Sequence, residues 1–319
     1  MSVSPRITLA RIETAARAID PVFLHTPQFV AESLGRELAL RVAVKLETLN
    51  PIRSFKGRGA DWLVGQSPDQ VPLCCASAGN FGLAMAYACR KRQLPLTVYA
   101  GVSANPLKLE RIEQLGAQVI RHGADFDEAK HEARRAAGKA GARLVEDSLE
   151  VETVEGAGTI GLELLDFPEP MDAVLLALGN GAMLNGVGSV LKARRPHTRV
   201  FAVQAAGAPA MIESWRAGRV IEYASVNTIA DGIAVRVPIP EALADMVGLV
   251  DDAFLVEEES LVRGMQLIYR HLGLVIEPSG AAGLAALLEN KEQFRGQLVG
   301  LVLCGGNLTE TQMQQWLHT

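Results

Sequence analysis

A lysine with glycine neighbours is the first candidate for chemistry in this sequence. Lys56 lies in the segment from Asn50 to Ala60, called here the lysine loop, directly after Phe55 and before Gly57 and Gly59. A lysine becomes a covalent catalyst when its surroundings leave its amine free of a proton. Most lysines are solvated surface residues. Lys56 is therefore a candidate catalytic residue only if other segments supply the rest of a site.

A second candidate is the serine loop, residues 77 to 82, which follows an apolar run at 73–76. Its small residues let a ligand approach the backbone, and the N–H groups that open the next helix suit an anion such as a carboxylate. The Asn80 amide can donate a hydrogen bond to a phenolate oxygen. An ordinary strand-to-helix turn has the same composition, so this loop alone does not identify a site.

The glycine loop, residues 179 to 186, follows the most apolar run of the chain. Glycine-rich turns at helix N-termini bind phosphate through backbone N–H groups. A dinucleotide-binding fold would also place such a turn here. Its G-x-G-x-x-G spacing fails at Leu184, however, and the next strand ends in Gln204 rather than in an acid for a ribose. The pattern therefore favours a phosphate site over a dinucleotide site.

Two further turns could line a pocket. The thiol turn, Cys304 to Asn307, ends the last apolar run of the chain, and its cysteine stays a neutral thiol unless its surroundings perturb it. The segment from Asp231 to Ala234 is a turn that is uninformative by itself. A buried core thiol followed by a turn would give the first pattern as well.

Length and composition limit the class of protein. The chain has 319 residues, of which 49% are hydrophobic and 21% charged, with a net charge of -5. This length predicts two lobes rather than one small core. The two signs of charge are scattered, with no basic patch and interleaved aromatics, so nucleic acid is not an expected partner. No apolar run reaches the ~18 residues that a membrane helix needs.

The N-terminus and the cysteines indicate a cytoplasmic protein. Residues 1–20 predict an amphipathic helix with Ser4 as its cap and Pro5 at its first position, without the apolar centre of a signal peptide. Cys74, Cys75 and Cys89 are expected to be small core residues in a reducing compartment, since no cysteine has metal-ligand spacing.

Strand-like and helix-like runs alternate along most of the chain, which predicts an α/β fold with twisted, parallel-rich sheets between helical layers. We expect two domains, a large one from residues 1–68 plus 146–319 and a small one from 69–145. The predicted strands are 42–47, 73–76, 96–100, 118–121, 143–146, 173–178, 200–204, 253–256 and 298–303.

Taken in order, these segments resemble the pyridoxal-phosphate enzymes of the tryptophan synthase β fold (fold type II). Within that fold they are most similar to the serine/threonine dehydratase and serine racemase group. The resemblance covers about residue 10 to about residue 318. A single motif would be weak evidence for it, whereas all of the motifs in the same order are specific. The matching motifs are Ser54 to Ala60, Ser77 to Asn80, Gly179 to Leu184, Cys304 to Asn307, and two shorter ones, Thr228 to Gly232 and Glu277 to Gly280.

The resemblance implies pyridoxal 5′-phosphate as the cofactor and gives each matched residue a role. Lys56 would hold the cofactor covalently and later move the Cα proton, and Phe55 before it would contact the cofactor. Asn80 would bind the 3′-oxygen, and Cys304 would face the pyridine nitrogen. The remaining implied contacts are Gly179, Asn180, Gly181, Ala182 and Met183 for the phosphate, Gly232 for the cofactor, and Ser77, Ala78, Gly79, Asn80 and Phe81 for the substrate carboxylate.

A thiol at the ring nitrogen has a chemical consequence. A carboxylate there would keep the nitrogen protonated, whereas the neutral Cys304 offers no charge to stabilise a pyridinium. Loss of a β-substituent together with the Cα proton suits such a site, and transamination does not. The implied reaction is α,β-elimination from a β-hydroxy amino acid such as threonine or serine, giving a 2-oxo acid and ammonia.

Several positions depart from the group's pattern. Ala78 replaces the second serine that racemases use as a base, so we expect little racemase activity. Gln204, Ala208 and Ala210 stand where metal-binding relatives carry acids, so we expect no metal requirement.

Arg53 and Phe81 leave the substrate side chain open. Arg53 either recognises a second anionic group, as in 3-hydroxyaspartate, or is a solvated or structural arginine. Phe81 replaces a histidine that is common in the group and would make the pocket wall more apolar.

Two other functions stay open. One is a β- or γ-replacement synthase similar to cysteine or threonine synthase, and the other is a cofactor-binding protein without turnover. The relatives imply a homodimer. We also expect no C-terminal regulatory domain after the thiol turn, and hence no end-product allostery of the kind seen in feedback-inhibited threonine dehydratases.

Overall fold

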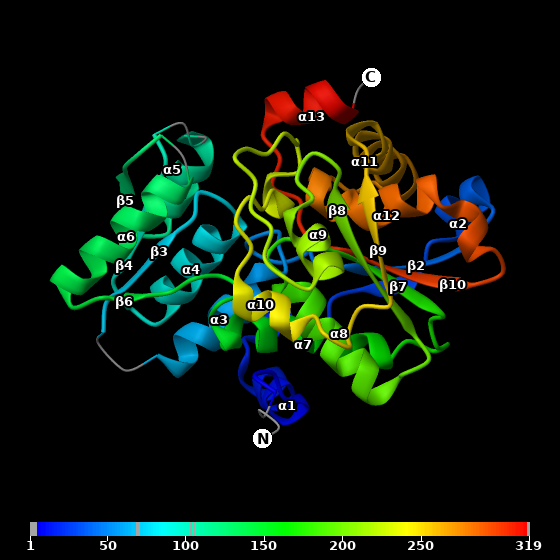
Figure 1. Ribbon diagram of the computed structural model, residues 1–319, viewed down its shortest axis with the longest axis horizontal. Coiled ribbons are helices and arrows are strands. Elements are labelled where there is room, and N and C mark those ends of the chain that lie inside the picture. The colour runs from blue at the N-terminus through cyan, green and yellow to red at the C-terminus, as the bar shows by residue number, and fades with distance from the viewer. Residues whose placement is uncertain (1–4, 68–70, 103, 105, 125, 318–319) are drawn as a thin grey trace.

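The structure is a computed structural model that describes residues 5–317 apart from 68–70, 103, 105 and 125. Two β-sheets lie side by side, each with helices on both faces (Figure 1). The larger sheet has the order β1-β2-β10-β7-β8-β9, in which β1 pairs with β2 antiparallel and the other pairs are parallel. Its strands are β1 (Gln28–Val30), β2 (Arg41–Leu46), β7 (Ala173–Ala177), β8 (Arg199–Ala205), β9 (Asp252–Val256) and β10 (Leu298–Leu303).

The smaller sheet has the order β5-β4-β3-β6 and is parallel throughout. Short apolar runs become such strands because parallel sheets are covered on both faces. The predicted α/β class with parallel-rich sheets is therefore confirmed. The strands of this sheet are β3 (Leu73–Ala76), β4 (Leu96–Ala100), β5 (Gln118–Arg121) and β6 (Arg143–Leu144).

Helices complete the layers. On the larger sheet, α12 covers one face, with α11 outside it, and α8 with α7 covers the other (Figure 1). On the smaller sheet, α6 packs on one face, and α4 and α5 pack on the other. The helices are α1 (Leu9–Ala18), α2 (Glu32–Leu38), α3 (Lys56–Gln66), α4 (Asn80–Lys91), α5 (Pro106–Gln114), α6 (Phe126–Ala140), α7 (Val151–Leu165), α8 (Ala182–Arg194), α9 (Ala210–Ala217), α10 (Pro240–Asp245), α11 (Glu258–Leu272), α12 (Pro278–Glu289) and α13 (Glu310–Leu317).

The cysteines illustrate how the strands of the smaller sheet are buried. Side chains alternate across a strand, so Cys74 packs with the α6 layer and Cys75 packs with the α4 layer. Both are free thiols, as is the buried Cys89. Burial raises the pKa of the Cys89 thiol to about 12, so it stays neutral. The prediction that these three cysteines are core residues is confirmed.

The core of the smaller sheet also takes in residues from outside 69–145. Ile19, Ile52 and Leu63 pack into the same cluster as Cys75. Helix α3 therefore contacts both halves of the molecule, and the division into 1–68 plus 146–319 and 69–145 stays a prediction.

The N-terminal helix begins later than predicted. Pro5 precedes α1, which starts at Leu9 with Thr8 as its cap, and the hydroxyl of Thr8 accepts from the backbone N–H of Arg11 at 3.4 Å. Threonine caps a helix well in this way. Ser4 lies outside the described residues. Among the helices that the structure describes, none is long and apolar enough to cross a membrane.

Candidate active site

The lysine loop is a turn organised by one side chain. The Asn50 carbonyl oxygen accepts from the backbone N–H of Ser54 at 3.3 Å, and its amide donates to the Ser54 carbonyl at 3.1 Å. The Ser54 hydroxyl accepts from the N–H of Lys56 at 3.3 Å, where α3 begins. Lys56 thus projects from the first position of a helix. Its Nζ lies 4.5 Å from the centre of the Phe55 ring, and its side chain is 17% exposed.

The thiol turn lies directly against the lysine loop. The Phe55 N–H donates to the Cys304 carbonyl, and the Gly306 N–H donates to the Arg53 carbonyl, each at 3.0 Å. An isolated β-bridge joins Ser54 to Gly305 between them. Two segments far apart in the sequence are therefore held together by backbone contacts.

The Cys304 thiol is buried and neutral. Burial raises its pKa to about 12, with Glu277 adding to the effect and Lys56 opposing it. Its sulfur lies 3.7 Å from the Ser279 carbonyl, which accepts the weak S–H hydrogen bond. A ligand nitrogen beside this thiol would meet no charge on the sulfur.

Asn80 belongs to a hydrogen-bonded cluster that the sequence analysis did not identify as a unit. Its amide donates to Glu277 Oε1 at 2.6 Å, and its carbonyl oxygen accepts from the Asn307 amide at 2.8 Å. Burial raises the pKa of Glu277 to about 7, with Asp231 adding and Lys108 opposing. The two partners fix the orientation of the Asn80 amide.

The serine loop is stabilised by hydrogen bonds between its own residues. The Ser77 hydroxyl accepts from the N–H of Gly79 at 3.3 Å and from the N–H of Gly82 at 3.1 Å. A Cβ at Gly82 would lie 2.3 Å from the Ser77 carbonyl oxygen, so only glycine fits there. Ala78 is half-buried beside these residues, whereas Phe81 is buried in the core of the smaller sheet.

The glycine loop forms a backbone cradle. Gly181 caps α8 with φ +100, a conformation that glycine adopts without strain. A Cβ at Gly179 would lie 3.0 Å from the Gly232 carbonyl oxygen, and one at Gly232 would lie 2.6 Å from Ser279 Oγ. Because Ser279 also meets the Cys304 sulfur, the loop and the thiol belong to one region.

The side chains of the glycine loop leave its backbone available. Ala182 and Met183 point into the hydrophobic cores. The Ala182 N–H donates to the Ser148 hydroxyl at 3.2 Å. Within the part of the chain that the structure describes, the buried oxygens Asn180 Oδ1 and Ser279 Oγ have no hydrogen-bond partner. Unpaired buried polar atoms at a glycine turn indicate a polar ligand.

Asp147 is a site residue that no motif pointed to. Lys56 Nζ donates to Asp147 Oδ2 at 2.5 Å, and the two side chains are 17% and 27% exposed. The only sequence signal was an acidic pair, Glu146 and Asp147, at the end of the predicted strand 143–146. The observed β6 ends earlier, at Leu144, so both acids lie in the segment that leaves the sheet.

A buried charge network supports α3 just beyond Lys56. The Arg58 side chain has no exposed surface and bonds Glu47 through two nitrogens, each at 2.8 Å. It bonds the Glu163 carboxylate at 2.5 and 3.0 Å, and Lys45 Nζ donates to Glu163 at 2.5 Å. Two cations and two carboxylates thus tie α3 to β2 and α7.

Glu163 makes this network sensitive to acid. Burial by itself would raise its pKa, but Arg58 and Lys45 outweigh burial and lower the pKa from the ordinary 4.5 to about 2. The unfolded chain therefore binds this proton more readily, and the stabilisation from Glu163, present above pH 4.5, is lost as the pH falls towards 2.

We expect the thermal midpoint of the protein to drop over this pH range, and to drop less steeply in Glu163→Gln, which has no such carboxyl group to titrate. Melting curves taken at half-unit steps of pH measure both slopes. Equal slopes in the two proteins would assign the acid sensitivity to other groups.

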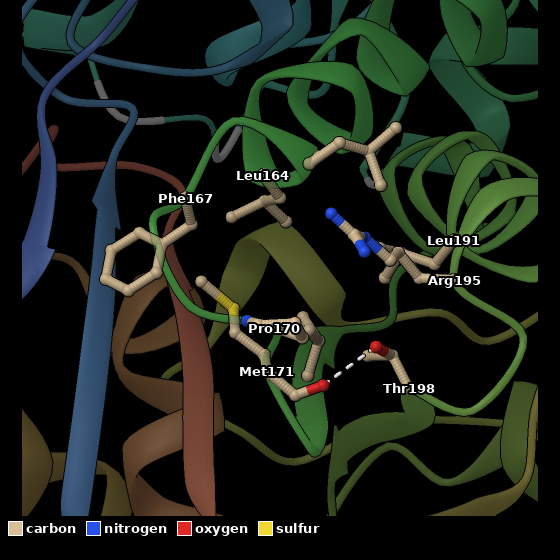
Figure 2. A pocket seen from close by; sticks show the side chains of 9 residues that line it. Leu164, Phe167, Pro170, Met171, Leu191, Arg195 and Thr198 are labelled. Atoms are coloured by element: carbon tan, nitrogen blue, oxygen red, sulfur yellow. Dashed lines mark hydrogen bonds between the residues drawn. The ribbon is translucent and has the colours of Figure 1, made fainter.

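The side chain of Arg53 and the cavity in Figure 2 contribute nothing to this cluster of contacts, although the Arg53 carbonyl accepts from Gly306. Arg53 is exposed, with φ 51, and its predicted contact with substrate stays a prediction. Figure 2 shows the side chains that line a cavity, among them Thr198 and Met171, which are joined by a hydrogen bond. The cavity has a volume of about 10 Å³, and Thr198 Oγ1 donates to the Met171 carbonyl at 2.7 Å. Met171 precedes β7, whereas the glycine loop follows it, so the cavity lies at the other end of the sheet. Its volume admits about one water molecule.

Comparison with known proteins identifies the class. A family model described as "Pyridoxal-phosphate dependent enzyme" matches residues 19–305. The chain belongs to this family, and its α/β fold is the one that the resemblance implied. Pyridoxal 5′-phosphate is the family's cofactor. The glycine cradle, the unpaired Ser279 hydroxyl, the neutral Cys304 thiol and Lys56 fit this group.

Individual relatives show which members of the family this chain is similar to. The chain is 32% identical over 305 residues to an L-threonine ammonia-lyase of Thermotoga maritima, covering 95% of this chain and 76% of that one. It is 29% identical over 297 residues to an L-threo-3-hydroxyaspartate ammonia-lyase of a Pseudomonas species, covering 92% and 93%. Maize serine racemase has a similar structure, with a TM-score of 0.91 and 28% identity over 97% of this chain and 96% of that one.

Proposed function

We propose that this protein is a pyridoxal-phosphate-dependent ammonia-lyase that dehydrates a β-hydroxy amino acid to a 2-oxo acid and ammonia. One observation carries the proposal. The half-buried amine of Lys56 projects from the start of α3 in a loop that is bonded to the turn of a neutral, buried thiol. A positioned amine and an uncharged partner for a ring nitrogen are what α,β-elimination requires.

Each residue has a stated task in the reaction. When bound, pyridoxal phosphate draws electrons away from the Cα of the amino acid. Lys56 Nζ takes the Cα proton, and the Asn80 amide, oriented by Glu277 and Asn307, binds the cofactor's phenolic oxygen. Cys304 contributes no charge to the ring nitrogen, which favours departure of the β-hydroxyl over transamination.

The backbone binds the two anionic groups. The glycine loop, from Gly179 to Met183, binds the phosphate at the start of α8 through its N–H groups other than that of Ala182, which donates to the Ser148 hydroxyl. The serine loop binds the substrate carboxylate. Since the N–H groups of Gly79 and Gly82 already donate to Ser77, the carboxylate contacts fall to the other amides of the loop.

The substrate is a small amino acid with a hydroxyl on Cβ. The names of the relatives, an L-threonine ammonia-lyase and an L-threo-3-hydroxyaspartate ammonia-lyase, support this class and differ in the charge of the side chain. Arg53 is the residue through which a second carboxylate would be favoured. We further propose a homodimer in the cytoplasm, with domains at 1–68 plus 146–319 and 69–145.

A substrate panel tests the function. The purified protein, loaded with cofactor, is incubated with L-threonine, L-serine and L-threo-3-hydroxyaspartate. Ammonia and 2-oxo acid are then measured, and we expect them to form in equal amounts. Parallel incubations of O-acetylserine with sulfide and of phosphohomoserine test for a replacement synthase. Replacement products without oxo acid would select that alternative, and a cofactor-loaded protein without any turnover would select a binding protein.

Racemisation is expected to be slow because Ala78 has no group that can move a proton on the second face of the substrate. Since a positioned base contributes about 10²–10⁴-fold, D-serine should form at roughly a hundredth of the rate of pyruvate or less. Chiral chromatography of serine reactions measures the ratio, with Ala78→Ser as the comparison. Comparable rates of D-serine and pyruvate formation in the unmodified protein would contradict this.

Activity is expected to survive removal of divalent cations. The predicted acid positions hold Gln204, Ala208 and Ala210, and Gln204 uses its side chain to accept from the Ile212 N–H at 3.2 Å. Hard cations require oxygen ligands, mostly carboxylates. Rates measured before and after EDTA dialysis should agree. A fall that magnesium reverses would refute the prediction.

A further inference from the structure

Asp147 offers Lys56 a carboxylate on one side and leaves its other oxygen unused. Oδ2 accepts from Lys56 Nζ at 2.5 Å, whereas Oδ1 is buried and has no hydrogen-bond partner among the described residues. A buried carboxylate oxygen without a partner is costly. Such a group is retained where it acts in function rather than in stability.

The chain around Asp147 is fixed in place at several points. The Val145 N–H donates to the Cys74 carbonyl at 2.8 Å, which extends the pairing of β6 with β3. Ser148 adopts φ 68, an uncommon conformation for a residue other than glycine. Its N–H donates to Thr153 Oγ1 at 3.0 Å, and its hydroxyl accepts from the glycine loop at Ala182. The backbone at Asp147 is thus held by hydrogen bonds of the residues before and after it, Val145 and Ser148.

The charge state of Lys56 changes as it works. In the proposed reaction the Cα–H bond breaks, the proton joins Lys56 Nζ, and the electron pair of the bond stays with the substrate. Nζ then becomes an ammonium. A carboxylate at hydrogen-bond distance stabilises that ammonium and orients its N–H bonds.

We propose that Asp147 is a positioning residue that holds the proton on Lys56 Nζ after it leaves the substrate. This inference rests on the proposed role of Lys56 as the base. It adds to that proposed function a residue, Asp147, that acts through Lys56 and lies outside all the matched motifs.

Asp147 is expected to act on cofactor binding in the opposite direction from its effect on proton transfer. The Lys56–Asp147 ion pair stabilises the cofactor-free protein, and covalent attachment of the cofactor at Nζ requires the neutral amine. Replacing Asp147 by asparagine therefore removes a stabilisation of the cofactor-free state. Loss of Asp147 should slow proton transfer without weakening cofactor binding, whereas a structural residue would affect both in the same direction.

The test uses the cofactor-loaded protein and L-2-aminobutyrate, which resembles threonine without its hydroxyl. Proton NMR in D₂O follows exchange of the Cα proton, which reports the Lys56 step without elimination. The variants are Asp147→Asn, Asp147→Glu and, as the matched control, Glu146→Gln. Glu146 is the neighbouring acid, and its partners are Lys130 at 2.6 Å and Arg134 at 2.7 Å in α6. Titration of each cofactor-free variant with pyridoxal phosphate gives its dissociation constant.

In Asp147→Asn we expect exchange to slow by about 10- to 100-fold, less than the ~10²–10⁴-fold that a base itself contributes because Lys56 is still present, with a cofactor dissociation constant no higher than about twice that of the unmodified protein. Asp147→Glu should recover part of the exchange rate, and Glu146→Gln should match the unmodified protein.

Unchanged exchange in Asp147→Asn overturns the inference, and so does slower exchange with a matching loss of cofactor affinity. If the unmodified protein exchanges the Cα proton but releases no ammonia from any β-hydroxy amino acid, the proposed elimination fails and the role of Asp147 stands.

Discussion

Replacing Lys56 with alanine is expected to reduce ammonia release by at least about 10³-fold, because one side chain both holds the cofactor and moves the Cα proton. After borohydride reduction, mass spectrometry should find the cofactor mass on the peptide that contains Lys56 in the unmodified protein. The variant should carry no such mass on any peptide. Its circular dichroism should be unchanged, since the amine has one hydrogen bond, to Asp147.

Lys192 is the matched control for this prediction. Its Nζ donates to Asp251 at 2.5 Å and its side chain is 19% exposed, close to the values for Lys56. Lys192→Ala should therefore keep its activity and its covalent cofactor. Persistence of ammonia release in Lys56→Ala, or a cofactor mass on another lysine, would remove the basis of the proposed mechanism.

Replacing Arg58 with methionine is expected to destabilise the protein by about 3–5 kcal/mol, the usual cost of leaving a buried charge without its partner. Glu47 and Glu163 would both lose their bonds to the guanidinium, and Lys45 would be the one cation of the network left for two carboxylates. Urea unfolding followed by fluorescence measures the change. Cofactor affinity should fall as well, because Arg58 anchors the helix that begins at Lys56.

An exposed arginine provides the comparison. Arg41 bonds Glu169 through two nitrogens at 2.8 and 2.6 Å, but the two side chains are 52% and 49% exposed. Exposed ion pairs contribute ~0–1 kcal/mol, so Arg41→Met should unfold at nearly the same urea concentration as the unmodified protein. If Arg58→Met behaved in the same way, the network would not be what stabilises α3.

Much of the fold follows from short apolar runs. The strands predicted at 73–76, 96–100, 118–121 and 298–303 agree with β3, β4, β5 and β10 residue for residue. Their ends are marked by prolines, glycines and polar turn residues, and burial makes the runs of β3 and β10 continuously apolar, whereas the edge strand β5 is apolar only at its two central residues. The short elements β1, α2 and α10 were missed because three to seven residues carry too little periodicity to be distinguished from a loop.

The site could be predicted only where one segment carries its own signal. Glycines at close approaches and a lysine at a helix start are local features. The partners of those residues come from elsewhere: Asp147 is 91 positions from Lys56, and Glu277 is 197 positions from Asn80. No pattern within a single segment predicts such pairs, because tertiary packing alone determines which side chains meet.

The place of β10 in the larger sheet bears on how the molecule is made. It lies between β2 and β7, although it comes last in sequence among the strands that the structure describes. The β3–β6 sheet draws on one continuous stretch and can assemble early on the nascent polypeptide. The larger sheet must wait with its centre vacant and apolar edges uncovered until β10 arrives. The turn that follows β10 is the partner of the lysine loop, so the proposed cofactor site is completed only in the last stage of folding.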